Sequence, residues 1–213
     1  KTSTVNLLSD ILNSNHIKTL ACGNNGVSVF KSLDDNYDYI VLEISSYQLE
    51  YIKKLDSHIS VILNLSTDHL ERHETLKKYF REKLKIFDNA KHKIINNNLE
   101  YSKKAITFDV KKKSIYVNNS VVGNLEFKNC NLISYKEEKY MINGKHEAYN
   151  LAACIAVLSI LGLSIDEIIV GFSKRSHLSH RLERFCTFNG VTYINDSKST
   201  NSDSTFNALE SVE

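Results

Sequence analysis

The hydrophobic pattern predicts a chain in which strands and helices alternate. Apolar residues at helical spacing follow residues 1–4, so a helix is expected to begin there. A second helical pattern covers residues 75–90. Short apolar runs predict strands at residues 16–22, 39–42, 59–65, 93–96 and 105–108. Strands that alternate with helices predict an α/β fold with a parallel sheet covered on both faces.

The pattern changes in the second half of the chain. Residues 111–144 carry short β runs broken by Asn and Gly, which predicts antiparallel strands at an edge of the sheet. Two helices are expected at 146–162 and 165–172, followed by a polar linker at 174–180. Beyond it, Asn189-Gly190 between two apolar runs predicts a hairpin. These features suggest one domain over residues 1–176 and the beginning of another over residues 177–213.

Composition narrows the class of protein. The 213 residues suffice for one α/β domain and part of another, at ~100–200 residues per domain. The net charge is only +2, so no basic field for nucleic acid is expected. The most apolar run, 151–163, is shorter than the ~20 residues that cross a bilayer, and a cytoplasmic protein without membrane contact is expected.

Four widely spaced cysteines form no C-x-x-C pair. They are Cys22, Cys130, Cys154 and Cys186. Free thiols in a reducing compartment fit this spacing better than disulfides or a zinc site.

The first two residues are typical of the second half of a phosphate-binding loop. Lys1 is suited to phosphate, the Thr2 hydroxyl to Mg²⁺, and the helix N–H groups to an anion. Without the preceding glycines the pair is weak by itself. The chain begins inside this motif and stops in a helical pattern, so we expect it to be a fragment.

Two predicted strands end in polar clusters. Glu43 follows the run 39–42, and Asp68-His69 follow the run 59–65. Ligands of open α/β sheets bind outside the carboxyl ends of the strands, so Glu43 is placed to hold a phosphate-bound cation. Alternatively, Glu43 begins a loop or caps the next helix. His69 is suited to metal or phosphate, although a lone loop histidine is more often simply exposed.

Lys83 falls within the apolar stripe of the helix predicted at 75–90. Tyr79 and Phe87 lie one turn away on either side. Such surroundings depress the pKa of a lysine, and its neutral amine can then react with CO₂ to give a carbamate, an oxygen ligand suited to Mg²⁺. The alternative, which the residues alone favour, is that Lys83 extends along the rings to water.

Two further polar segments are candidates for binding. Residues 195–201 place seven polar side chains between a strand and a helix, more than an N-cap needs. His180-Arg181 in the linker could bring a guanidinium to phosphate when the domains close, or could form a solvated hinge.

Taken together, these segments resemble the Mur ligase family. Each segment is weak alone, but their order along the chain is specific, and the last resembles the signature of the member that adds D-glutamate. The segments are KTS (1–3), GNNG (23–26), LEISSYQLE (42–50), ILNLSTDHLERH (62–73), YFREKLKIFDNAK (79–91), GKHEAYNLAA (144–153), HRLE (180–183) and NDSKSTN (195–201).

The resemblance implies a three-domain ATP-dependent ligase of peptidoglycan precursor synthesis. This chain would hold a P-loop-type central ATPase domain with a mostly parallel sheet and an antiparallel extension, then the start of a Rossmann-like C-terminal domain. ATP would phosphorylate the carboxylate of UDP-MurNAc-L-alanine, and the amine of D-glutamate would displace the phosphate. The implied partners are these small molecules, and a monomer is expected.

The resemblance also implies roles for individual residues. Lys1 would bind the γ-phosphate, Thr2 and Glu43 the first of two Mg²⁺ ions, and His69 and carbamylated Lys83 the second. The remaining nucleotide-side positions are Ser3, Asn150, Arg181, Asp196 and Lys198, with Arg181 also catalytic. The positions on the side of UDP-MurNAc or D-glutamate are Asn24, Ser45, Gln48 and Thr200.

Three departures from the family pattern accompany the resemblance. The P-loop glycines and the UDP-binding domain are missing, Glu147 replaces a usual asparagine, and Ser179 replaces a usual proline. Alternatives are another Mur ligase, a folylpolyglutamate synthase-like ligase without the 195–201 motif, or a non-catalytic nucleotide-binding module. The module is disfavoured because binding alone needs no second metal. An isolated fragment is expected to turn over little.

Overall fold

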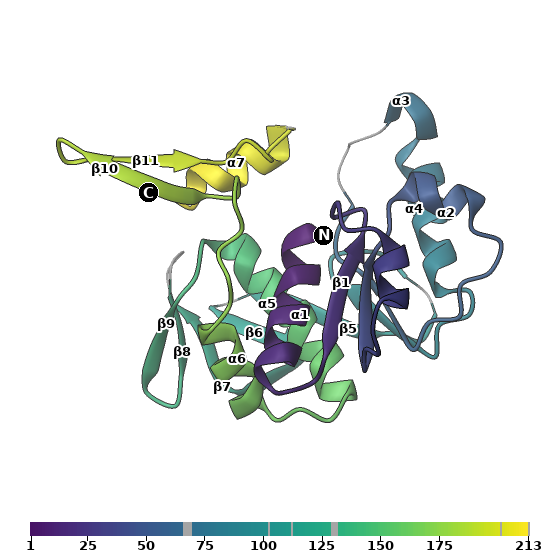
Figure 1. Ribbon diagram of the computed structural model, residues 1–213, viewed down its shortest axis with the longest axis horizontal. Helices are drawn as coiled ribbons and strands as arrows, with labels where there is room; N and C mark the ends of the chain where they lie inside the picture. The colour runs from purple at the N-terminus through teal and green to yellow at the C-terminus, as the bar shows by residue number, and fades with distance from the viewer. Residues whose placement is uncertain (66–69, 102, 112, 129–131, 201, 213) are drawn as a thin grey trace.

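The computed structural model describes residues 1–65, 70–101, 103–111, 113–128, 132–200 and 202–212. An α/β body contains most of the chain, and a hairpin with one helix stands apart from it at the C-terminal end (Figure 1). The N-terminus lies on the side of the body that faces this C-terminal unit.

The body begins with α1 (Thr2–Ser14), which starts where the sequence predicted and buries its apolar stripe. Strand β1 (Thr19–Gly23) follows and pairs in parallel with β2 (Tyr39–Glu43). β1 begins later than predicted because Ile17 N–H bonds to Leu12 O and His16 adopts a φ of 61°, which ends the helix in a turn. Between the strands lies a short 3₁₀ helix, η1 (Val29–Leu33).

A seven-stranded sheet, ordered β3 to β9, forms the centre of the body. β3 (Ile59–Ile62), β4 (His92–Asn96) and β5 (Ile106–Lys111) are parallel. The following strands pair antiparallel, and they are β6 (Ser114–Val117), β7 (Ser120–Lys128), β8 (Leu132–Tyr135) and β9 (Glu138–Met141). The predicted α/β fold with an antiparallel extension is confirmed.

Helices pack on this sheet to form two cores. α5 (Lys145–Ile160) and α6 (Ile165–Ser173) join α1 in the main core, where Leu151, Ile155 and Phe172 are fully buried. A smaller core forms around Phe87, Ile62 and Ile95. There the single helix predicted at 75–90 is divided into α4 (Leu76–Leu84) and η2 (Lys85–Phe87).

Two short helices, α2 (Ser46–Tyr51) and α3 (Leu70–His73), lie next to α4 (Figure 1). Within the described parts of the chain, no helix combines the length and the apolar character that a bilayer crossing requires.

An apolar slot separates β2 from β3. This cavity of about 410 Å³ is lined by Ile40 and Leu42 on one side and Val61 and Leu63 on the other. The sequence predicted residues 39–42 as a buried strand, and this prediction was wrong for two side chains, since Ile40 is 50% and Leu42 36% exposed. The reason is that β2 pairs only with β1 among the described strands.

The C-terminal unit consists of β10 (Glu183–Phe188), β11 (Val191–Asn195) and α7 (Ser202–Glu210). The predicted hairpin is confirmed, because Asn189 and Gly190 have φ of 49° and 77°, as a tight turn matching the strand twist requires. The unit meets the body where Ser211 packs on Gly144. A Cβ on Gly144 would lie 2.0 Å from Ser211 Oγ, so only glycine permits this approach.

Candidate functional site

Glu43 ends β2 as a buried carboxylate that is 4% exposed. Its Oε1 accepts a hydrogen bond from Asn24 Nδ2 at 3.2 Å and lies 3.9 Å from Lys1 Nζ. Its Oε2 is buried and has no hydrogen-bond partner among the described residues. A buried carboxylate oxygen without a donor is costly unless a cation satisfies it, so the atom fits a hard metal ion.

Two other predicted residues, Ser45 and Gln48, lie at the start of α2 and cap this helix. Ser45 is the N-cap, and its Oγ accepts from Gln48 N at 3.2 Å. In return, Gln48 Oε1 accepts from Ser45 N at 2.8 Å, which completes a capping box. The alternative that Glu43 caps this helix is therefore wrong. The Ser-x-x-Gln spacing was a readable signal for the cap, and it gives both residues a structural role.

Lys83 is held at the carboxyl end of β3. Its Nζ donates to Asn64 O at 3.0 Å and lies 4.4 Å from the centroid of the Tyr79 ring. Phe87, the other predicted neighbour, turns into the smaller core through η2. The amine thus reaches the end of a neighbouring strand, with one aromatic ring as a close cation–π partner.

A second cavity, of about 380 Å³, lies between the body and the C-terminal unit and is called the cleft here. Lys1 and Lys83 line both the cleft and the slot. Because Glu43 lines the slot and lies beside Lys1, its carboxylate is next to the cleft. The cleft brings together six predicted residues from distant parts of the sequence, namely Lys1, Ser3, Lys83, Asn150, Arg181 and Asp196.

Several of the cleft residues have defined partners. Asn150 Oδ1 accepts from Thr4 Oγ1 at 2.9 Å, which turns its amide group toward the first turn of α1. Asp196 accepts from Leu182 N at 3.0 Å and from the Ser199 hydroxyl, so it organises the loop between β11 and α7. Both side chains are therefore fixed before any ligand binds.

Other predicted residues lie apart from the cleft lining. Lys198 and Thr200 are exposed, and the backbone N–H of Lys198 donates to His180 O at 3.2 Å. Thr2 opens α1. His69 lies outside the described residues. No group of three or more His, Cys, Asp or Glu side chains converges in the described chain.

Burial shapes the charge of the cleft. Burial lowers the pKa of the Lys1 side chain, and the neighbouring Glu43 carboxylate partly offsets this. Burial also lowers the pKa of His146, against the opposing effects of Glu147 and Asp196. Lys1, Lys83 and Arg181 share this cavity with Asp10, Glu147 and Asp196, and Glu147 is already paired with Arg175. The three cationic side chains are suited to contact an anionic ligand such as a polyphosphate.

Sequence reasoning missed the anchoring of the linker. Arg175 Nε lies 2.7 Å from Glu147 Oε1, and its Nη2 donates to Met141 O at 2.8 Å. The next residue, Ser176, donates its backbone N–H to Asp10 Oδ2 at 2.9 Å. Glu147, which replaces the usual asparagine of the family, is thus paired with Arg175 of the same chain. No local signal could pair residues 28 positions apart in sequence.

Residues 1–158 match the family of the Mur ligase middle domain. The chain belongs to the Mur ligase family. The resemblance inferred from the ordered motifs is therefore confirmed.

Curated relatives share this region with the chain. It is 34% identical to the UDP-N-acetylmuramoylalanine–D-glutamate ligase of Alkaliphilus metalliredigens, over 100% of this chain and 50% of that protein. The enzyme of the same name from Koribacter versatilis is 35% identical over 99% of this chain and 50% of its own length. The chain thus spans about half the length of these relatives.

Solved Mur ligase structures share the fold. MurF from Acinetobacter baumannii aligns with a TM-score of 0.69 at 18% identity, covering 98% of this chain and 51% of that one. MurF from Thermotoga maritima, solved in complex with ADP, aligns with a TM-score of 0.68 at 16% identity, covering 99% of this chain and 54% of that one. At these identities the alignments show the fold alone.

Proposed function

We propose that the protein containing this chain is an ATP-dependent ligase that adds D-glutamate to UDP-N-acetylmuramoyl-L-alanine. The observation that carries the proposal is the buried Oε2 of Glu43, which has no hydrogen-bond partner among the described residues. It lies beside Lys1, which also lines the cleft together with Lys83 and Arg181. The names of the similar curated proteins and the NDSKSTN segment support D-glutamate as the amino acid.

The proposed domain division places the central domain at 1–176 and the start of the C-terminal domain at 177–213. The bonds of Arg175 and Ser176 to α5 and α1 support a boundary immediately after them. The slot supports a further strand in the longer protein. The carboxyl end of β2 lies by Lys1 and that of β3 by Lys83, and both lysines line the slot. We infer from this that β2 and β3 run in the same direction. A parallel strand between them would join both sheets, and its loop would supply the glycine-rich half of the phosphate site.

In the proposed reaction, a carboxylate oxygen of UDP-MurNAc-L-alanine attacks the γ-phosphorus of ATP while the bond to ADP breaks. The amine of D-glutamate then attacks the acyl carbon, phosphate leaves, and the amine loses a proton. Carboxylate and phosphate repel each other, so the Lys1 amine and the N–H groups that begin α1 would screen this charge. Mg²⁺, when bound, would neutralise the developing charge on the phosphate oxygens.

Glu43 and Thr2 would hold one Mg²⁺, and His69 with carbamylated Lys83 the second. Carbamate formation needs a neutral amine, which attacks CO₂ and releases a proton. The bond from Lys83 Nζ to Asn64 O supports this placement because it fixes the amine at a strand terminus. The proposed nucleotide residues remain Ser3, Asn150, Arg181, Asp196 and Lys198. The proposed contacts of the other substrates remain Asn24, Ser45, Gln48 and Thr200.

The test measures phosphate release and product mass with the full-length protein, ATP and UDP-MurNAc-L-alanine. Ligation is expected with D-glutamate and not with L-alanine or L-lysine, and glutamyl-folate is not expected to replace the UDP substrate. Glu43→Gln is expected to lower kcat by about 100-fold or more, because it removes the charge that holds the metal. The control Glu126→Gln changes an exposed carboxylate on β7 and is expected to retain activity.

Two outcomes would contradict the proposal. Equal use of the amino acids would exclude the D-glutamate assignment. ATP binding without ligation under any of these conditions would instead indicate a nucleotide-binding module.

A further inference from the structure

The geometry points to His73 as a positioning residue that holds the start of α2 and the amine of Lys83 in fixed relation. The inference rests on the proposed function for the catalytic role of Lys83. It does not depend on that function for the placement of the side chains.

His73 ends α3 as a buried imidazole that is 5% exposed. It stacks against Tyr47 of α2, with ring centroids 5.7 Å apart and planes inclined by 15°. It also stacks against Tyr79 of α4, at 4.9 Å and 25°. The imidazole of α3 therefore contacts rings of α2 and α4 and lies nearly parallel to both of them.

Polar contacts fix the rotation of the same ring. Nε2 lies 3.0 Å from Ser46 Oγ, and Ser46 is itself 4% exposed. On the other side, Nδ1 lies 3.9 Å from Glu50 Oε1, and Arg72 holds the Glu50 carboxylate at 2.7 Å. A rotated ring would leave the Ser46 hydroxyl buried without this partner, which is unfavourable.

Tyr79 carries the effect of His73 to Lys83. Tyr79 is 5% exposed, and its ring centroid lies 4.4 Å from Lys83 Nζ. The two residues are four positions apart on one helix face, so the ring and the amine are neighbours. Tilting of the Tyr79 ring would displace the amine from the position at which it bonds to Asn64 O.

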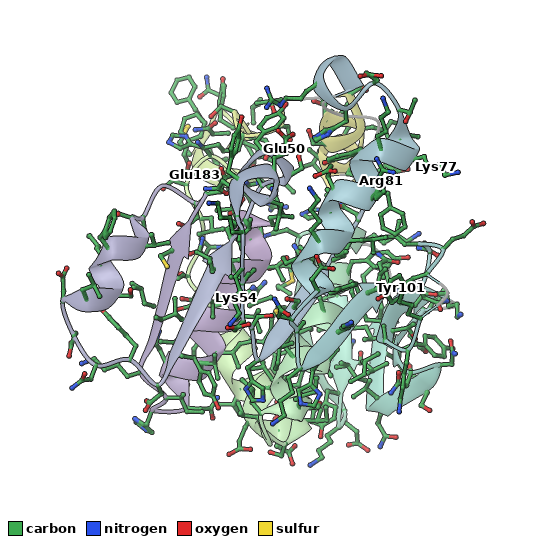
Figure 2. The ribbon with its side chains drawn as sticks, turned by 90° about the vertical axis from the view of Figure 1, so that its right-hand side faces the viewer. Glu50, Lys54, Lys77, Arg81, Tyr101 and Glu183 are labelled. Atoms are coloured by element: carbon green, nitrogen blue, oxygen red, sulfur yellow. The ribbon has the colours of Figure 1, made fainter. Side chains whose placement is uncertain are left out.

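The opposite end of the network reaches the carboxylate site. Ser46 is the first residue of α2, and Glu43 ends the strand three positions earlier. Figure 2 shows Glu50 on α2 near the upper part of α4, whose outer side carries Lys77 and Arg81. His73 thus connects the element that follows Glu43 with the face of α4 that carries Lys83.

Packing alone does not account for a histidine here. A phenylalanine would fill a similar volume and stack on both tyrosines without burying two ring nitrogens. Burying a polar ring is unfavourable unless its hydrogen bonds are made, and here the bond to Ser46 is made. Substitutions at position 73 can separate the contribution of stacking from that of the hydrogen bond.

The test uses His73→Phe and His73→Gln in the full-length protein. His73→Phe keeps the stacking and loses the Ser46 bond, whereas His73→Gln keeps a polar partner and loses the stacking. His16→Asn is the control, because His16 is exposed and asparagine tolerates its φ of 61°.

The first readout is labelling of Lys83 by an amine-reactive anhydride, followed by mass spectrometry with exposed Lys77 as internal reference. The rate at Lys83 is expected to rise about threefold to fivefold in His73→Gln, as for loss of one cation–π contact, and to stay near the parent value in the control. Tyr79→Leu removes the ring directly and is expected to give the same rise, which provides a second route if His73→Gln folds poorly.

The second readout is steady-state ligation. His73→Gln is expected to lower kcat about tenfold or more with little change in KM for ATP, because a displaced amine affects reaction geometry more than nucleotide binding. His73→Phe is expected to fall between His73→Gln and the parent.

Unchanged labelling of Lys83 in both His73→Gln and Tyr79→Leu would overturn the inference. So would a kcat equal to the parent value in a folded His73→Gln variant. If the parent itself ligates no amino acid, the proposed function fails, and the labelling result still decides whether His73 positions Lys83.

Discussion

The α/β body and the C-terminal unit follow the same local rules but differ in what covers their apolar residues. In the body, Leu151 and Phe172 are 0% exposed. In the C-terminal unit, Phe188 of the hairpin is 64% and Phe206 of α7 62% exposed. Local sequence therefore suffices to form a hairpin and a helix, while burial requires a second layer that packs on them.

The cleft is lined by residues from both regions. Lys1 and Asn150 come from the well-packed body, and Arg181 and Asp196 come from the linker and the C-terminal unit. The bonds of Arg175 and Ser176 hold the linker to the body, and beyond them His180 and Leu182 have φ of 64° and 47°. A change in the angle between the regions would therefore be absorbed after residue 176.

The largest expected loss of stability comes from a substitution in the core of the body. Leu151→Ala is expected to lower the free energy of unfolding by about 3 kcal/mol, because it leaves a cavity among fully buried side chains. Phe188→Ala in the hairpin is expected to change it by less than about 0.5 kcal/mol. Urea denaturation followed by circular dichroism measures both. Equal losses would show that the two regions are packed alike.

The next largest expected loss of stability concerns the ion pair of Arg175 with Glu147, which anchors the linker to the body. Glu147→Ala is expected to lower the free energy of unfolding by about 2 kcal/mol, because it leaves the largely buried Arg175 guanidinium without its carboxylate. A double-mutant cycle with Arg175→Ala measures the coupling. The exposed pair Lys136 and Asp166 is the matched control, and no measurable coupling is expected there. Similar coupling in both pairs would argue against a special role for the anchor.

A smaller effect concerns the pH dependence of the body. Burial alone would raise the pKa of Asp109, but hydrogen bonds from Asn97, Lys111, Tyr149 and the Val110 N–H together lower it. The folded state then binds the proton less readily than the unfolded state. The contribution to stability is present above the unfolded pKa of about 4 and is lost as pH falls through the folded value.

Asp109→Asn tests this sign. The variant is expected to be less stable than the parent at neutral pH, and the difference is expected to shrink as the pH is lowered below about 4. Urea midpoints across this range measure it. A difference that grows on acidification would contradict the direction of the pKa shift.

The smallest expected effect concerns the reactivity of the cysteines in the two regions. Burial raises the pKa of the Cys154 thiol well above its ordinary value, whereas Cys186 on β10 is exposed. Cys186 is expected to react with an aromatic disulfide reagent in the folded protein, and Cys154 only after unfolding, because the thiolate is the reactive form. Mass spectrometry of the labelled peptides distinguishes the two sites, and Cys186→Ser should remove the fast labelling at position 186. Fast reaction of Cys154 would show that the body opens readily.

Much of the fold was readable from local pattern. The helical spacing of α1, the antiparallel strands after residue 111 and the Asn189-Gly190 turn were predicted at or near their observed positions. The pattern failed where exposure depends on a neighbouring strand, as for Ile40 and Leu42 on β2. Apolar character predicts the tendency of a side chain to be buried, and it does not supply the element that buries it.

For the candidate site, the sequence determined which residue types stand at strand ends and helix starts, since periodicity and capping act within a few residues. The order of the motifs also sufficed to indicate the family. Only the tertiary structure decided that Asn24 and Lys1 flank the Glu43 carboxylate, that Tyr79 rather than Phe87 faces Lys83, and that Arg175 pairs with Glu147. These contacts join residues from different elements, and their distances are set by how helices and strands pack together, which no local spacing encodes.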